Sequence, residues 1–225
     1  MAIYHLSVQI ISRTGARSAI AAAAYRSRSA MYDERQGLTF DYAKKKDLVH
    51  SEIMLPVGAP ERLLNRETLW NEVEAMEKRR DAQLAREIDV ALPRELSLEQ
   101  QINLIREFCS EEFTKEGMIA DINIHNYKDN PHAHIMLTMR EVTGEGFGKK
   151  NRLWNKKEEI NAWRRKWAEK INTKLLEAGF GTKIDHRSFE ERGVELIPQR
   201  HVGYNIKFVP KEYLQLDNTD LDKNT

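Results

Sequence analysis

Two short apolar runs separated by a polar turn constrain the fold of this chain more than any other feature. The first extends from Met118 to Ile124, the second lies within residues 132–140, and the turn between them is rich in Asn, Asp and Pro. Runs of this length joined by such a turn are typical of a β-hairpin. We therefore expect two adjacent antiparallel strands here.

Three histidines lie at the turn end of this hairpin. His125 closes the first run, and His132 and His134 are two residues apart on the second, so both rings point from one face of an extended strand. Pairing of the strands brings His125 back beside His132. Three converging imidazoles are the ligand set of a metal site that leaves positions open for substrate. The alternative is that these are ordinary half-buried histidines. Core packing, however, does not require three histidines within ten positions.

Composition sets the class of protein. The chain has 225 residues, of which 40% are hydrophobic and 32% charged, and these values fit a soluble globular protein with a real core. No apolar run reaches membrane-spanning length, so we expect no membrane insertion. The one cysteine cannot form an internal disulfide, which suits a reducing cytoplasm. A net charge of +1 permits DNA binding without indicating it.

The remaining pattern predicts an α+β fold with a central antiparallel β-sheet flanked by helices, which we expect on one face of the sheet. The other face would carry polar side chains and the histidine metal site. Strands are expected at 3–11, within 37–55 and at 83–93; helices follow caps at Ser18, to about residue 30, and at Ser97, to about Phe113. A charged helix over 63–76, a glycine-rich loop at 144–148 and a long helix over 154–175 complete the prediction.

Several segments together resemble the MobA/MobL-type (MobQ class) conjugative relaxases, within the broader HUH endonucleases. They are the opening strand 1–5, the alanine-rich helix that contains Tyr25, the acidic strand 86–93, the motif from His125 to His134, and the late segments 184–188 and 198–203. The resemblance covers roughly residues 1–205 and implies an HUH relaxase-like fold. It divides the chain into a relaxase domain, 1–205, and a polar tail or linker, 206–225.

The resemblance implies that Tyr25 is the nucleophile for site- and strand-specific nicking and rejoining of DNA at an origin of transfer. The covalent intermediate would be a 5′-phosphotyrosine. Tyr25 follows four small alanines and is flanked by Arg26 and Arg28, which favour a nearby phosphate. Without the histidines, an ordinary packed tyrosine would explain Tyr25 better.

Two carboxylates are expected on the polar face of the strand 83–93. Glu87 either accepts a hydrogen bond from the far nitrogen of a ligating histidine or acts as a base toward Tyr25, and Asp89 is the alternative for either role. A surface carboxylate pair is the competing interpretation. The expected cofactor is a divalent ion, Mn²⁺ or Mg²⁺, of which Mn²⁺ suits imidazole ligands better.

The expected partner is single-stranded DNA next to a duplex or hairpin, together with relaxosome accessory proteins and a type IV secretion coupling protein, in the cytoplasm of a bacterium that carries the plasmid or mobile element. Candidate DNA contacts are basic residues in three places. These are Arg13 and Arg17 in the first turn, Arg26 and Arg28 beside Tyr25, and Lys149, Lys150 and Arg152 before the long helix. The run from Lys44 to Lys46 is a further candidate.

Three other functions fit part of the pattern. A rolling-circle replication initiator shares the metal motif, but its tyrosine usually follows the histidines, whereas Tyr25 precedes them by about a hundred residues. A metal-dependent phosphoesterase would use water and leave no protein–DNA adduct. An accessory DNA-binding protein with a structural metal would bind without cutting.

Overall fold

The structure is a computed structural model that describes residues 4–126, 129–188 and 190–193. The chain divides into two compact units, residues 1–185 and 186–225, and the fold below is that of the first unit. The predicted tail, 206–225, and the motif segment 198–203 lie outside the described residues. In the part that is described, no helix combines the length and the apolar character needed to cross a membrane.

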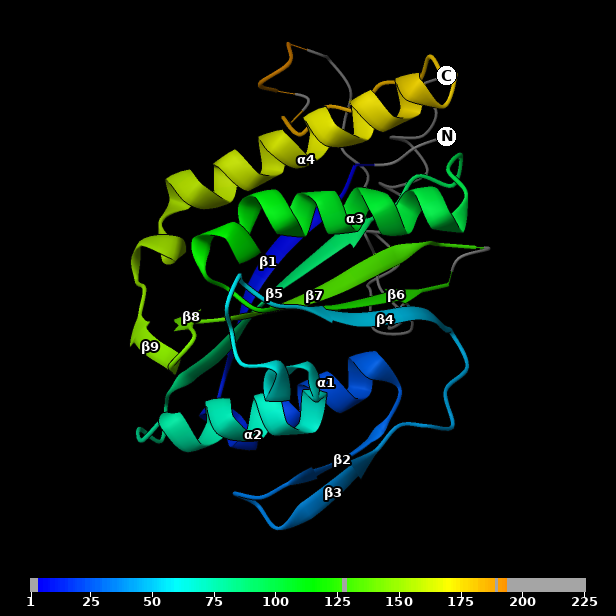
Figure 1. The fold of residues 1–225 in the computed structure, drawn as a ribbon. Coiled ribbons are helices and arrows are strands. Elements are labelled where there is room, and N and C mark those ends of the chain that lie inside the picture. Colours follow the sequence, from blue (N-terminus) through cyan, green and yellow to red (C-terminus); the bar gives the residue numbers. More distant parts are fainter. Residues whose placement is uncertain (1–3, 127–128, 189, 194–225) are drawn as a thin grey trace, which may run out of the picture. The chain divides into compact units, whose positions relative to one another are not determined.

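A five-stranded sheet forms the centre of this unit (Figure 1). Its order is β1 (Leu6–Ser12), β5 (Gln83–Ala91), β7 (His132–Thr138), β6 (Ala120–His125) and β4 (Leu48–Met54). Every neighbouring pair is antiparallel. The predicted α+β class with a central antiparallel sheet is therefore confirmed.

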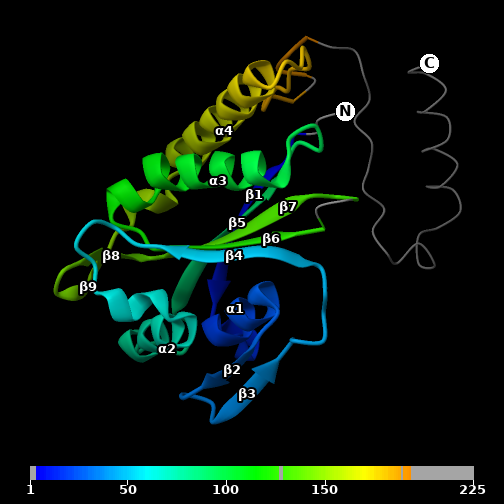
Figure 2. The same cartoon turned by 45° about the vertical axis from the view of Figure 1, so that its right-hand side comes forward.

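Helices cover both faces of the sheet, so the expectation of one covered face was wrong. Figure 2 shows α3 (Leu98–Glu112) and α4 (Lys157–Glu177) on one side, and α1 (Ala19–Ser27) and α2 (Arg66–Met76) on the other. The reason lies in the face that was expected to be polar. At the end distant from the histidines it carries Ile11, Ala85 and Met136, which pack with buried residues of α1 and α2.

The apolar face of the sheet packs beneath α3 and α4. Side chains of alternate strand residues, such as Ile88, Ile122 and Ile135, join Phe108 and Trp167 in one buried cluster. Burying each large apolar side chain contributes about 1.5–3 kcal/mol, so this layer supplies much of the rigidity on which the opposite face depends.

The helix α1 ends earlier than the sequence predicted. Ser18 Oγ accepts hydrogen bonds from the N–H groups of Ile20 and Ala21, which is the expected cap. At the other end Arg28 adopts a left-handed conformation with φ 51°, and the chain turns into a strand at Ala30. The predicted cap at Ser97 is present as a full capping box with Gln100.

Two small hairpins accompany the main sheet. One joins β2 (Ala30–Asp33) and β3 (Leu38–Asp41), of which β2 was not predicted. The other joins β8 (Arg140–Thr143) and β9 (Gly146–Lys150), where a glycine-rich loop was expected. Short 3₁₀ helices complete the described elements: η1 (Thr14–Ala16), η2 (Glu61–Leu64), η3 (Thr114–Glu116) and η4 (Leu153–Asn155).

Candidate active site

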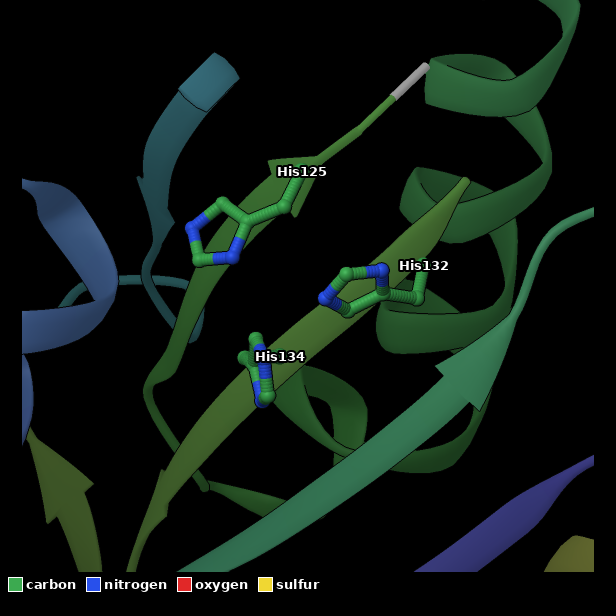
Figure 3. Close-up of side chains that lie close together, drawn as sticks. All are labelled: His125, His132 and His134. Carbon is green, nitrogen blue, oxygen red and sulfur yellow. The ribbon is translucent and has the colours of Figure 1, made fainter. Parts of the chain in front are cut away.

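Three histidines converge at one end of the sheet, as the hairpin predicted. His125 on β6 lies directly opposite His132 on β7, and His134 is two residues further along the same strand. The ring centroids are 5.4 Å apart for His125 and His132, and 5.1 Å for each of the other pairs. One nitrogen from each ring lies within 4.8 Å of the others, so the three rings surround a common point (Figure 3).

One nitrogen of each histidine ring forms a hydrogen bond with a protein oxygen, and this bond orients the ring. His125 Nε2 lies 2.6 Å from the carbonyl oxygen of Arg26, and His132 Nδ1 lies 2.7 Å from that of Asn130. His134 Nδ1 lies 3.0 Å from Glu87 Oε1. Since oxygen is an acceptor in all three contacts, these nitrogens carry the proton. In the neutral form of each ring, the lone pair then lies on His125 Nδ1 and on Nε2 of His132 and His134.

This donor set is consistent with a divalent metal ion. Neutral imidazoles with one fixed N–H and one free lone pair are the state in which histidine coordinates a metal. His125 is fully buried, and burial is the largest cause that lowers its pKa to about 4, so its ring is neutral at physiological pH. His125 therefore offers its lone pair to a cation without first losing a proton.

Glu87 lies on β5 beside the histidines and is 1% exposed. Both of its oxygens accept hydrogen bonds from Arg26, while Gln9 Nε2 donates to Oε2 at 2.5 Å. Burial raises the pKa of Glu87, but the hydrogen bonds from His134 and Arg26 outweigh it and bring the pKa to about 2. The carboxylate is thus ionised, immobilised and already in contact with His134.

Asp89, the alternative carboxylate, also lies beside His134. Strand pairing places it directly opposite that residue, on the same face of the sheet, where it is half-buried. The carboxylate that reaches the ring nitrogen is nevertheless that of Glu87.

Tyr25 lies in the last turn of α1 and is 38% exposed. Its ring forms a T-shaped pair with that of Tyr42, at a centroid distance of 5.3 Å. The guanidinium of Arg28 lies 4.5 Å from the ring centroid and the ammonium of Lys45 lies 4.0 Å from it. The pKa of Tyr25 is lowered, chiefly through its interaction with Lys45 and further by Arg28, against the opposing effect of burial.

Arg28 connects this tyrosine to the histidines. Its Nη1 donates to the carbonyl oxygen of Tyr25 at 2.5 Å, and its Nη2 lies 3.5 Å from His125 Nδ1. Asp47 fixes the guanidinium from the other side through two hydrogen bonds of 2.7 Å. Arg28 in turn is the main cause that lowers the pKa of Asp47 to about 2. Nothing in the local sequence marks Asp47, which belongs to an irregular segment before β4, and sequence reasoning missed it.

Comparison with known proteins agrees with this geometry. The model of the MobA/MobL family matches residues 17–211, which include α1, the acidic strand and the histidine hairpin. The chain belongs to the MobA/MobL family. The match covers the three histidines and the tyrosine helix together.

Individual MobA/MobL relatives support the same placement. The chain is 39% identical to "Conjugal transfer protein TraA" of Agrobacterium fabrum, over 94% of this chain and 22% of that protein. It is 37% identical to "Mobilization protein MobL" of Acidithiobacillus ferridurans, over 90% of this chain and 62% of that protein. The chain therefore spans about a fifth of the length of TraA and under two thirds of MobL.

A solved structure has the same fold. It is described as "Molecular Basis of Vancomycin Resistance Transfer in Staphylococcus aureus" and superposes with a TM-score of 0.79 at 36% identity. The similarity covers 83% of this chain and 100% of that one.

The basic residues predicted to contact DNA differ in their surroundings within this MobA/MobL fold. Arg13 directs all its N–H donors at protein acceptors, namely Glu74 and the carbonyl oxygens of Glu74, Glu77 and Arg79. Such a guanidinium has no donor left for a phosphate in this conformation. Its contacts are those of a structural residue that holds the turn after β1 to the end of α2.

The other candidates form two groups. Arg17 is exposed and lines a hollow of about 370 Å³ with Arg26 and Glu87, beside α1. Lys150 and Arg152 line a cavity of about 580 Å³ with Gln83, at the end of β5 opposite to that which faces the histidines. The exposed Lys149 precedes Lys150 on β9. Glu87 and Gln83 are four residues apart on β5, so at about 3.4 Å per residue the two groups lie roughly 14 Å apart along the strand.

Proposed function

We propose that this chain is the relaxase domain of a conjugal-transfer or mobilization protein, with residues 1–205 as the functional unit. It nicks one DNA strand at an origin of transfer through a covalent 5′-phosphotyrosine and later rejoins it. The observation that carries the proposal is the set of three histidines whose ring nitrogens lie within 4.8 Å of one another, linked through Arg28 to Tyr25. The relatives' names, conjugal transfer and mobilization proteins, support the biological setting.

The reaction is a transesterification. The Tyr25 oxygen attacks the scissile phosphorus in line, the new P–O bond forms on the phenol, and the bond to the 3′ oxygen breaks. The products are a free 3′-hydroxyl and DNA joined to Tyr25 through its 5′-phosphate. One phosphoester replaces another, so the step is nearly thermoneutral, and attack by a 3′-hydroxyl reverses it.

His125, His132 and His134 would hold a divalent ion beside the scissile phosphate. When bound, such an ion supplies charge neutralisation and polarises the phosphoryl group. We propose Mn²⁺ or Mg²⁺ as the working ion: three imidazoles suit Mn²⁺ better, whereas Mg²⁺ prefers oxygen and would act through its abundance.

Glu87 acts in this proposal by positioning His134 and not as the base for Tyr25. A carboxylate with a pKa of about 2 that already accepts hydrogen bonds from Arg26, Gln9 and His134 is a poor acceptor for a phenol proton. Its hydrogen bond fixes the His134 tautomer and directs Nε2 toward the cluster. Asp89 would contribute its charge close to the same ring.

The substrate we propose is single-stranded DNA that continues into a duplex or hairpin. Arg28 at the Tyr25 ring, and Arg26 and Arg17 beside α1, would meet phosphates near the nucleophile. Lys149, Lys150 and Arg152 would meet the phosphate backbone at the Gln83 end of β5. Relaxosome accessory proteins and a type IV secretion coupling protein are the expected partners in the bacterial cytoplasm, on a plasmid or mobile element.

The test uses end-labelled single-stranded oligonucleotides that tile the cognate transfer origin, with Mn²⁺ or with EDTA. We expect metal-dependent cleavage with a slower-migrating protein–DNA adduct on a denaturing gel. Tyr25→Phe should abolish both while binding remains, and Tyr32→Phe, at an exposed tyrosine of β2, is the matched control.

Other outcomes would assign another function. Cleavage without an adduct would indicate a water nucleophile and a phosphoesterase. Binding with neither cleavage nor adduct would indicate an accessory DNA-binding protein. Nicking that supports replication and not transfer of its plasmid would indicate a rolling-circle initiator.

A further inference from the structure

The Tyr25 ring contacts two cations, Arg28 and Lys45. Tyrosine has an ordinary pKa of about 10, so at neutral pH the nucleophile is almost entirely protonated unless something favours the phenolate. Two carboxylates of this site, Glu87 and Asp47, each have a pKa of about 2 and are held by Arg26 and Arg28. These two carboxylates are therefore poor bases for the phenol, whereas the positive charge at the ring offers another way to favour the phenolate.

The segment between β3 and β4 places a lysine at the ring. The Lys45 N–H donates to the carbonyl oxygen of Tyr42 at 3.1 Å, and the Asp41 side chain accepts from the Ala43 N–H at 2.9 Å, so a tight turn fixes this part of the chain. Tyr42 is itself tied to the end of α1 by a hydrogen bond of 3.2 Å from its N–H to Ser29. The result is an ammonium 4.0 Å from the Tyr25 ring centroid.

We propose that Lys45 is a positioning residue that activates Tyr25: its ammonium stabilises the phenolate, and the phenol proton leaves to solvent before the oxygen attacks phosphorus. This inference rests on the proposed function, in which Tyr25 is the nucleophile. Tyr25 is 38% exposed, so water reaches the phenol and can take the proton. The electron pair left on oxygen forms the bond to phosphorus, and the departing 3′ oxygen takes a proton from water.

Lys45 is distinguished from its basic neighbours by this contact. Lys44 and Lys46 are exposed on the same segment, and the described contacts of the Tyr25 ring are those with Tyr42, Arg28 and Lys45. Arg28 also faces the ring, but Asp47 neutralises much of its charge at 2.7 Å. Lys45 is thus the cation whose charge is free to act on the phenol, and its pKa effect on Tyr25 is the largest one.

The first experiment measures ionisation of Tyr25 directly and needs neither DNA nor metal. The whole chain is labelled with [¹³Cζ]tyrosine and titrated by NMR in EDTA, and the Tyr25 resonance is the one of seven that Tyr25→Phe removes. Lys45→Met should raise the pKa of Tyr25 above that of the unaltered chain, whereas Lys45→Arg should keep it close to that of the unaltered chain. Lys44→Met and Lys46→Met should leave the Tyr25 pKa unchanged. An unchanged Tyr25 pKa in Lys45→Met overturns the inference.

The second experiment measures nicking in a single turnover at saturating DNA, as a function of pH. Each unit of increase in pKa lowers the phenolate fraction about tenfold at neutral pH, so the nicking rate of Lys45→Met should fall by the factor that the titration gives. The deficit should shrink as the pH approaches the Tyr25 pKa of the variant. A deficit that is constant with pH, or one that saturating DNA removes, would mean that Lys45 only contacts the backbone.

The two proposals fail in different ways. If Tyr25→Phe still nicks DNA, the proposed function is wrong, and the NMR titration still reports whether Lys45 acts on the phenol. If Tyr25→Phe is inactive but Lys45→Met titrates and nicks like the unaltered chain, the activation inference alone is wrong.

Discussion

Replacing Glu87 by glutamine tests whether the site depends on an ionised, buried carboxylate. The substitution keeps the shape of the side chain but removes the charge that pairs with Arg26, and Arg26 is 14% exposed while Glu87 is 1% exposed. A pKa that falls from 4.5 to about 2 on folding corresponds to about 3.5 kcal/mol of stability at neutral pH, at about 1.4 kcal/mol per unit. We expect Glu87→Gln to lose roughly that amount.

The pH dependence gives the sign of this effect. Because the folded-state pKa is depressed, the contribution is fully present above the unfolded-state value of about 4.5 and disappears as the pH falls through about 2. The difference between the unaltered chain and Glu87→Gln should therefore be constant from pH 7 to pH 5 and should fall to roughly half by pH 3.

The assay is urea unfolding followed by tryptophan fluorescence in EDTA, so that metal binding does not contribute. Glu72→Gln is the matched control, because Glu72 pairs with the half-exposed Arg62 at the surface and should change stability by less than about 1 kcal/mol. A loss of under 1 kcal/mol in Glu87→Gln at pH 7, or a difference that does not diminish in acid, would refute the assignment of Glu87 as a stabilised carboxylate.

Three further predictions concern the metal site and the scaffold. His134→Ala should abolish Mn²⁺ binding in isothermal titration calorimetry, whereas His5→Ala, at an exposed residue outside the cluster, should bind normally; equal binding by both would place the metal elsewhere. Glu87→Gln should weaken Mn²⁺ binding about 10–100-fold through loss of its hydrogen bond to His134, and unchanged affinity would show that this bond does not orient the ring. Ser97→Ala should cost about 1 kcal/mol of stability through loss of the capping box of α3, without affecting Mn²⁺ binding, and a loss of metal affinity would contradict the separation of scaffold and site.

The histidine cluster could be predicted from the sequence because strand geometry alone fixes it. Side chains alternate along a strand, so His132 and His134 share a face whatever the rest of the fold does, and the polar turn sets His125 opposite His132. The contact of Glu87 with a histidine of the cluster followed from the same alternation on β5.

What the sequence could not provide depends on tertiary contacts. Helix propensity continued α1 to about residue 30, but Arg28 leaves the helix with a positive φ and is held there by Asp47, nineteen residues later. Arg13 resembled a phosphate contact because its partner Glu74 is distant in sequence. Coverage of the second sheet face was missed because Ile11, Ala85 and Met136 share that face with polar residues such as Gln9, Glu87 and His134.

The measurement that tests the central claim most directly is the identity of the residue that carries the DNA. The covalent adduct with a short oligonucleotide would be digested with trypsin and nuclease and sequenced by tandem mass spectrometry. Cleavage after Arg17 and Arg26 releases the peptide 18–26, in which Tyr25 is the sole tyrosine. We predict a phosphonucleotide mass on Tyr25 of this peptide; the same mass on any other peptide, or cut DNA with no modified peptide, would contradict the account.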